Sequence, residues 1–77
     1  MDLAINVELF DKPGTARVER AFGPNQRGRV FFEGTYWPAK FYIPETLINA
    51  EVRSIVTVIG RQGLTLLVMP LAAAVCS

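Results

Sequence analysis

The run Gly28-Arg29-Val30-Phe31-Phe32-Glu33-Gly34-Thr35-Tyr36-Trp37-Pro38-Ala39-Lys40-Phe41-Tyr42-Ile43 holds most of the aromatic residues of the 77-residue chain, including its single tryptophan. Glu33-Gly34-Thr35 interrupts the run in the middle, and turn-forming residues bound it at both ends. Two apolar-rich segments joined by a short connection that contains glycine are typical of a β-hairpin. We therefore take this aromatic hairpin as the element on which the other strands pack.

Side-chain alternation gives each arm of the hairpin an inner and an outer face. The arms span residues 27–33 and 35–43. The side chains expected to face the core are Val30, Phe32, Trp37, Ala39 and Phe41. The candidate partner-binding residues, expected on the outer face, are Arg29, Phe31, Tyr36, Lys40 and Tyr42. Pro38 lacks an amide hydrogen, so the second arm is expected to be an edge, or to bend, at that point.

Three further extended runs are expected, at residues 15–22, 53–59 and 64–69. The last run is apolar on both faces, which indicates a central or covered strand. Turns are expected at residues 11–14 and 60–63, and alternating apolar residues from Leu3 to Leu9 predict an additional N-terminal edge strand. Five principal short strands with regularly spaced turns favour an all-β fold, a small closed or partly closed barrel.

The connections carry their own expectations. Residues 44–52 are expected to form a loop or a single helical turn, with Leu47 and Ile48 directed inward. Three glycines in hairpin connections are expected to supply a positive φ, namely Gly34, Gly60 and Gly63. The tail at residues 71–77 is apolar and contains Cys76, the only cysteine. It has several open alternatives: packing on the barrel, dimerisation, contact with a membrane surface, or disorder.

Composition restricts the function more than it defines it. The chain is 51% hydrophobic and 19% charged, with a net charge of +1, so it has no strong field to attract nucleic acid. It contains no histidine and no phosphate-binding glycine loop, and one cysteine alone builds no thiolate metal site. The sequence therefore predicts a non-enzyme without cofactor or metal. No apolar window reaches the roughly 18–20 residues of a transmembrane helix, and no signal peptide is visible.

The region from residue 13 to residue 70 resembles the C-terminal soluble domain of the NfeD family. The resemblance is carried by Gly14-Thr15-Ala16, Gly28-Arg29-Val30, Gly34 with Tyr36-Trp37-Pro38-Ala39, and Val56-Thr57-Val58-Ile59-Gly60-Arg61-Gln62-Gly63-Leu64-Thr65-Leu66-Leu67-Val68. These elements cover about three quarters of the chain in the order of the family pattern. The chain departs from the family shortly before residue 56, where Arg53 or Ala50 stands in place of the usual glycine, and in the loop at residues 23–27, which looks longer than usual.

The resemblance implies a five-stranded OB-like β-barrel at residues 13–70, flanked by an extended segment at 1–12 and the apolar tail at 71–77. It also implies a protein partner, a membrane scaffold of the stomatin/flotillin type, and a link to membrane-protein quality control. The protein is then expected in the cytoplasm or at the membrane surface through its partner, and homo-oligomerisation and peripheral membrane association stay open. The membrane helices that usually precede this domain are not in the 77 residues, which leaves a short natural protein and an excised domain as alternatives.

A second function is a small OB-type protein that binds single-stranded nucleic acid. The outer aromatic residues of the hairpin, with Arg29 and Lys40 among them, are of the kind on which bases stack. Arg17, Arg20 and Arg27 are close to them in the sequence, but Glu19 and Glu33 are expected to dilute that positive charge. The near-neutral chain therefore favours a protein partner over nucleic acid.

Overall fold

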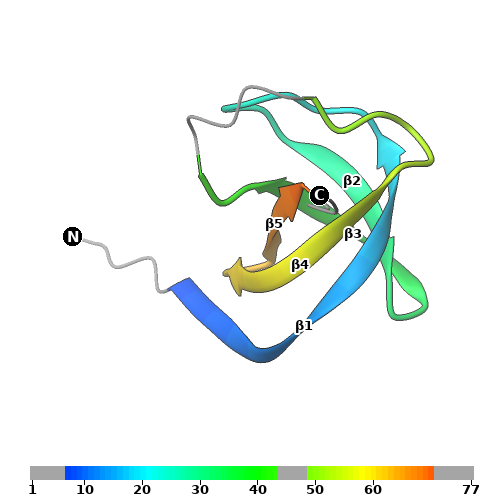
Figure 1. Ribbon diagram of the computed structural model, residues 1–77. Coiled ribbons are helices and arrows are strands. Elements are labelled where there is room, and N and C mark those ends of the chain that lie inside the picture. Colours follow the sequence, from blue (N-terminus) through cyan, green and yellow to red (C-terminus); the bar gives the residue numbers. More distant parts are fainter. Residues whose placement is uncertain (1–6, 44–48, 71–77) are drawn as a thin grey trace, which may run out of the picture.

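The computed structural model describes residues 7–43 and 49–70, which form five strands and no helix (Figure 1). The strands are β1 (Val7–Arg20), β2 (Gly28–Phe32), β3 (Thr35–Phe41), β4 (Ile55–Gln62) and β5 (Thr65–Pro70). They close into a barrel in the order β1-β2-β3-β5-β4. The pair β3–β5 is parallel and the other neighbours are antiparallel. This all-β, five-stranded, OB-like barrel confirms the predicted fold class.

The aromatic hairpin consists of β2 and β3, joined by the two residues Glu33 and Gly34. Their φ angles are 51° and 87°, and two successive positive φ angles are what a tight hairpin turn of the favoured twist requires. A Cβ atom on Gly34 would meet no atom within 4 Å. Glycine is therefore favoured here by the backbone angle rather than by lack of space, and the second arm begins at Thr35, opposite Phe32, as predicted.

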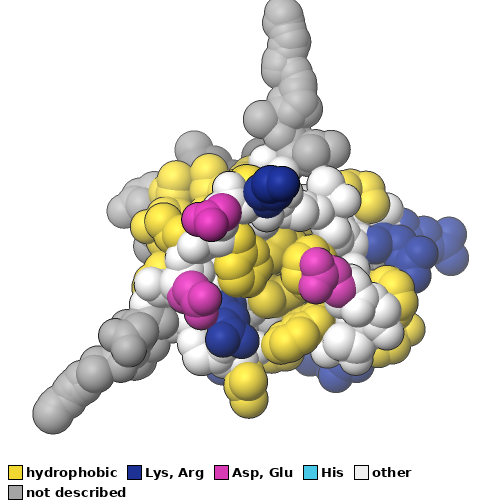
Figure 2. All heavy atoms as spheres, turned by 90° about the horizontal axis from the view of Figure 1, so that it is seen from below, with side chains coloured by type: hydrophobic (Ala, Val, Ile, Leu, Met, Phe, Trp, Pro, Cys, Tyr) yellow, Lys and Arg dark blue, Asp and Glu magenta, His cyan; other side chains and the backbone are white. Residues whose placement is uncertain are grey.

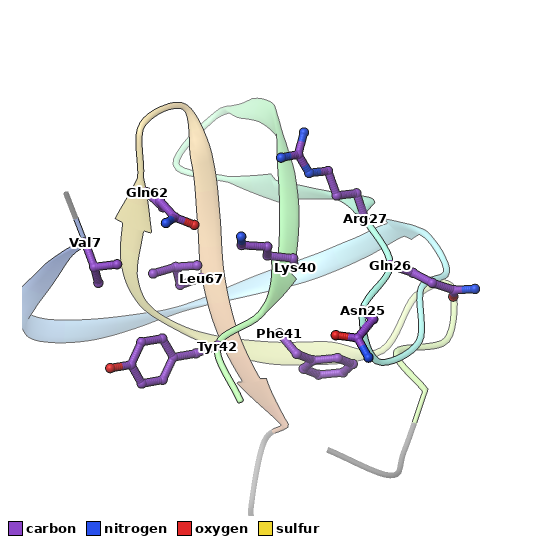
Figure 3. Close-up of a pocket in the computed structure, with 9 residues that line it drawn as sticks. All are labelled: Val7, Asn25, Gln26, Arg27, Lys40, Phe41, Tyr42, Gln62 and Leu67. Atoms are coloured by element: carbon purple, nitrogen blue, oxygen red, sulfur yellow. The ribbon is translucent and has the colours of Figure 1, made fainter. Parts of the chain in front are cut away.

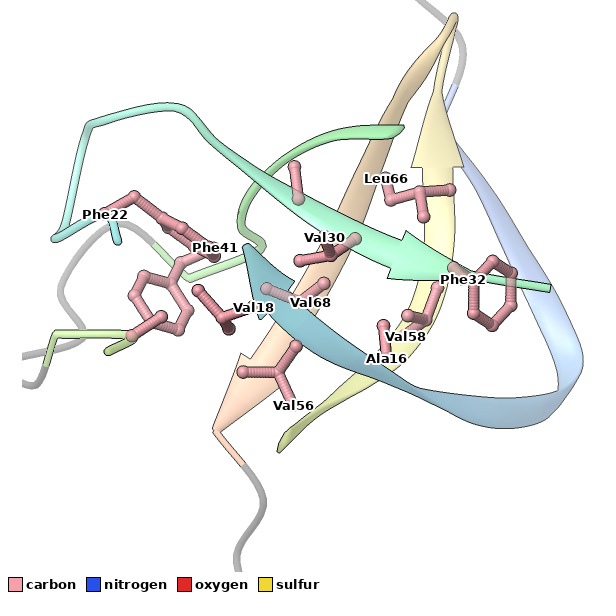
Figure 4. Close-up of a cluster of buried hydrophobic side chains, with 12 residues drawn as sticks. Ala16, Val18, Phe22, Val30, Phe32, Phe41, Val56, Val58, Leu66 and Val68 are labelled. Carbon is pink, nitrogen blue, oxygen red and sulfur yellow. The ribbon is translucent and has the colours of Figure 1, made fainter. Parts of the chain in front are cut away.

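The core is built by all five strands, as the close-up of the buried side chains shows (Figure 4). Each strand contributes one residue with no exposed surface: Val18, Val30, Ala39, Val58 and Val68. Phe32 and Phe41 are also buried, and Trp37 packs against the same cluster while its indole N–H donates to the carbonyl oxygen of Phe32 at 3.3 Å. The inner face predicted for the hairpin is therefore confirmed.

The N-terminal region differs from the prediction. Residues 11–14 form no turn, because β1 continues through them, so Val7 and Leu9 belong to the same strand as Ala16 and Val18 rather than to a separate edge strand. Instead, the register between β1 and β4 shifts between Leu9 and Gly14, which leaves the intervening residues without a partner on β4. Figure 1 shows the resulting bend of β1. The extra residues are accommodated as a bulge, which bends a strand without ending it.

The connection between β4 and β5 is also shorter than predicted. Strand β4 extends to Gln62, and the turn consists of Gly63 and Leu64 rather than residues 60–63. Gly63 has the expected positive φ of 61°, but Gly60 does not appear among the residues with positive φ. A Cβ atom on Gly60 would lie 2.3 Å from the carbonyl oxygen of Glu8, so glycine is required there because β1 crosses it closely.

Strand β5 is enclosed between β3 and β4, and four consecutive residues of it are buried: Thr65, Leu66, Leu67 and Val68. This confirms the prediction of a central or covered strand. Strand β3 pairs with β2 over Thr35 to Ala39 and with β5 only from Ala39 to Phe41. Pro38 is therefore paired on the β2 side alone, which agrees with the predicted edge position.

One end of the barrel is closed by the segment that precedes β4. Phe22 and Ala50 exchange two backbone hydrogen bonds, with N···O distances of 3.1 and 2.7 Å. The ring of Phe22 lies 5.0 Å from that of Phe41, centroid to centroid. The expectations for residues 44–48, including Leu47 and Ile48, and for residues 1–6 and 71–77 lie outside the described residues.

Candidate protein-binding surfaces

A transverse row of four side chains crosses the outer surface of the barrel. Cross-strand pairing places Ile55 of β4 beside Arg17 of β1, Arg17 beside Phe31 of β2, and Phe31 beside Tyr36 of β3. We call Ile55, Arg17, Phe31 and Tyr36 the aromatic row. Cross-strand partners of an antiparallel pair share one face of a sheet, so the row is a continuous surface on three neighbouring pairs of strands.

Contacts within the aromatic row hold its side chains in place. The rings of Phe31 and Tyr36 meet edge to face, with centroids 5.1 Å apart and an interplanar angle of 66°. The guanidinium carbon of Arg17 lies 5.5 Å from the centroid of Phe31, within the distance of a cation–π contact. Arg17 Nε also donates to a carboxylate oxygen of Glu19 at 2.9 Å. Tyr36 is 57% exposed at the end of this series of contacts.

A separate outer cleft of about 390 Å³ lies over the parallel pair β3–β5 (Figure 3). Its floor is Leu67, which is 2% exposed although it alternates with the inward-facing Leu66 and Val68. Lys40 lies beside Leu67 as its partner in the register. The residues that line the outer cleft are Val7, Asn25, Gln26, Arg27, Lys40, Phe41, Tyr42, Gln62 and Leu67.

The five predicted candidate residues are divided between these two surfaces. Phe31 and Tyr36 belong to the aromatic row and contact each other. Lys40 and Tyr42 line the outer cleft. Arg29 is exposed and lies opposite Arg20 on one side and Pro38 on the other, in neither surface. All five point outward, as expected, but the structure does not bring them into one site.

Sequence reasoning missed the members that come from other strands. Arg17 and Ile55 complete the aromatic row, and Arg27 and Leu67 belong to the outer cleft. A two-residue turn at Glu33 and Gly34 would have been enough to predict the pairing of Phe31 with Tyr36 by counting outward. The positions of Arg17, Ile55, Arg27 and Leu67 depend on the register between strands that are distant in sequence. The alternation of apolar and polar residues gives no information about that register.

The surface charges are mixed. On the face in Figure 2, acidic and basic side chains are interspersed with exposed hydrophobic ones. In the described part of the chain, no three His, Cys, Asp or Glu side chains are grouped so that they could hold a metal ion. Nor do residues 7–43 and 49–70 include a helix with the length and hydrophobicity needed to cross a membrane.

No protein-family model, curated protein or solved structure matches the chain. The resemblance to the NfeD soluble domain therefore stays a prediction from the residues that carry it. The evidence for function comes from the two surfaces themselves.

Proposed function

We propose that the chain is a non-enzymatic protein-interaction module, similar to the NfeD soluble domain, that binds a stomatin/flotillin-type membrane scaffold and takes part in membrane-protein quality control. The observation that carries an interaction role is the aromatic row. Tyrosine and arginine are the residue types that contribute most to binding at protein interfaces, and Tyr36 and Arg17 occur here on one exposed surface. The scaffold partner itself is taken from the family resemblance.

The fixed geometry of the row supports this role. Ordering a side chain on binding costs roughly 0.5–1.5 kcal/mol, and contacts made in the free protein reduce that cost. Phe31 already contacts both Tyr36 and Arg17, and Glu19 fixes Arg17 from the other side. A partner would therefore meet a preorganised surface with a tyrosine that remains more than half exposed.

The alternative function, binding of single-stranded nucleic acid, is supported by the OB-like barrel and by its outer aromatic residues. Three observations weigh against it. The guanidinium group of Arg17 lies over Phe31, so that face of the ring is not a free stacking platform. The Phe31 and Tyr36 rings are edge to face, and Glu19 neutralises Arg17. These features fit a protein surface better than a series of stacked bases.

A binding experiment tests the proposal. A purified stomatin/flotillin-type scaffold domain is immobilised, and the chain is compared with Tyr36→Ala and with Leu64→Ala, which shortens an exposed side chain at the β4–β5 turn outside the row. We expect Tyr36→Ala to weaken binding about tenfold or more, as for an interface hot spot, and Leu64→Ala to bind like the original chain. Circular dichroism confirms that both variants fold.

Either of two results would reject the proposal: no binding of the scaffold, or equal binding by Tyr36→Ala. A labelled single-stranded oligonucleotide is titrated in parallel at low and at physiological salt. Binding that survives physiological salt would favour the alternative, since purely electrostatic binding weakens steeply with salt. Sedimentation velocity of the chain and of Tyr36→Ala shows whether the chain self-associates and whether that association depends on the row.

A further inference from the structure

The outer cleft is chemically different from the aromatic row. Its volume of about 390 Å³ falls within the range of roughly 300–1,000 Å³ that ligand pockets span. Strand β3 contributes residues to both surfaces, Tyr36 to the row and Lys40 to the cleft, and Tyr42 directly after β3 also lines the cleft. The outer cleft is also lined by the loop between β1 and β2, the ends of β4 and β1, and the middle of β5.

One side of the outer cleft is apolar. Val7 and Tyr42 lie to one side of Leu67 in Figure 3, and they are 45% and 42% exposed. Leu67 beneath them is covered and serves as the floor. An apolar side chain placed between Val7 and Tyr42 would reduce the apolar surface that both expose to water.

The other side is cationic. Lys40 lies beside Leu67, and Arg27 extends from the loop between β1 and β2 on the side away from Val7 (Figure 3). None of the described lining residues is Asp or Glu. Lys40 is only partly exposed, so its charge is less screened by water than that of a fully exposed lysine. The described lining therefore favours an anion near an apolar group.

The loop that carries Arg27 is held in a defined conformation. The side-chain oxygen of Gln26, one of the lining residues, accepts a hydrogen bond from the backbone N–H of Gly23 at 2.7 Å. Gln26 N also donates to the carbonyl oxygen of Gly23 at 3.2 Å. These bonds make Gln26 a support for the loop, and Asn25, Arg27 and Lys40 are further polar groups at this end.

We infer that the outer cleft binds a short acidic peptide segment of a protein partner. An apolar side chain of the segment lies between Val7 and Tyr42, and the carboxylate of a neighbouring Asp or Glu pairs with Lys40 and Arg27. This inference rests on the proposed interaction role and adds the chemistry of the partner. It assigns to the partner an apolar residue next to an acidic one.

A peptide fits the outer cleft better than a nucleic acid strand does. The described lining offers two cations and one exposed aromatic ring, Tyr42, whereas binding of single strands uses a basic groove and successive stacking platforms. The floor is an aliphatic side chain, Leu67, which offers no ring on which a base could stack.

The test uses the whole chain and defined peptides, followed by amide chemical shifts in two-dimensional NMR. The probe is acetyl-Gly-Leu-Asp-Gly-amide. Its two controls replace Asp by Asn, which removes the charge, and Leu by Ala, which removes the apolar group. We expect saturable shifts at Arg27, Lys40 and Leu67 with the first peptide. Each control peptide is expected to bind about fivefold more weakly than the first peptide, which is the effect of losing one modest contact.

Two matched pairs of variants locate the site on the protein. Lys40→Glu is compared with Lys12→Glu, which makes the same change of charge on an exposed residue of β1 outside the cleft. Tyr42→Ala is compared with Tyr36→Ala in the aromatic row. We expect Lys40→Glu and Tyr42→Ala to abolish the shifts, and both control variants to keep them. Should Lys40→Glu fail to fold, the comparison of the Asp and Asn peptides still decides the role of the charge.

The outcomes separate this inference from the proposed function. Equal binding of the Asp and Asn peptides, or shifts that map to the aromatic row, would overturn the assignment of the outer cleft even if the scaffold binds. Tighter binding of a single-stranded oligothymidylate at the same residues would also overturn it. If the peptide binds in the cleft but the scaffold does not bind, the assignment of the cleft stands and the proposed scaffold partner is rejected.

Discussion

The two halves of β1 have similar sequence patterns and different structural roles. Its C-terminal half, residues 14–20, pairs with β4 and β2, and it buries Ala16 and Val18. Its N-terminal half, residues 7–13, pairs only with β4, and all its residues but Phe10 are exposed. Both halves contain alternating apolar residues, so alternation shows that a segment is extended but not whether its apolar face is covered.

This difference implies that the two halves contribute unequally to stability. A strand between two partners has both edges paired and its inner side chains packed in the barrel. A strand that pairs on one edge and exposes its side chains adds local hydrogen bonds and little apolar burial. Four predictions test this contrast, beginning with the one expected to have the largest effect.

Val18→Ala should lower the free energy of unfolding by about 2–3 kcal/mol, because it leaves a cavity among side chains from all five strands. Val7→Ala makes the same change in the N-terminal half, where the side chain is 45% exposed, and should change it by less than about 0.5 kcal/mol. Chemical denaturation followed by tryptophan fluorescence measures both. Similar losses for the two variants would show that the N-terminal half is as integral to the barrel as the C-terminal half.

Gly60→Ala should cost about 1–2 kcal/mol, because its Cβ atom would collide with the carbonyl oxygen of Glu8 on the crossing strand. The collision falls in the N-terminal half of β1, which can separate from β4 without opening the core. We therefore expect faster amide hydrogen exchange in residues 7–9 and unchanged protection in residues 15–18. Uniformly faster exchange along β1 would mean that the two halves unfold together.

Gly63→Ala serves as a control for this result. Gly63 also requires a special conformation, a φ of 61°, but a Cβ atom there would meet no atom within 4 Å. Its replacement should strain the β4–β5 turn and leave exchange in the N-terminal half of β1 unchanged.

The parts of the fold that were predictable are those set by neighbouring residues. The inner face of the aromatic hairpin follows from alternation on each side of Gly34, and the pairing of Phe31 with Tyr36 follows from the turn length. The turn predicted at residues 11–14 was wrong because pairing with a distant strand overrides the local sequence there. Asp11, Lys12 and Pro13 have turn-forming chemistry, but pairing of β1 with β4 on both sides of them keeps the strand continuous.

The parts that could not be predicted depend on contacts between distant strands. Gly60 is explained only by the close passage of Glu8, 52 positions earlier in the chain. The outer cleft exists because the parallel pairing of β3 with β5 brings Lys40 beside Leu67. The sequence shows which residues face outward, and the register decides which of them share a surface.

Arg17→Gln should lower the free energy of unfolding by about 0.5–1 kcal/mol, since it removes a cation–π contact with Phe31 and an ion pair with Glu19. Arg17 belongs to the C-terminal half of β1, where neighbouring strands hold both partners of the contact. A double-mutant cycle with Phe31→Leu isolates the contribution of the ring. A coupling energy near zero would show that Arg17 is only a surface charge and that the aromatic row is less ordered than its geometry indicates.

Glu8→Gln should have the smallest effect, less than about 0.5 kcal/mol, although Glu8 accepts a hydrogen bond from Arg61 Nε at 3.1 Å. Both side chains are largely exposed, so water and salt screen the pair. What small contribution there is should disappear as the salt concentration rises, whereas the loss in Val18→Ala should persist because burial is not screened. Denaturation of both variants at low and high salt makes the comparison. A loss in Glu8→Gln that is large and independent of salt would mean that pairing with Arg61 anchors the N-terminal half, and that the two halves of β1 differ less than their burial indicates.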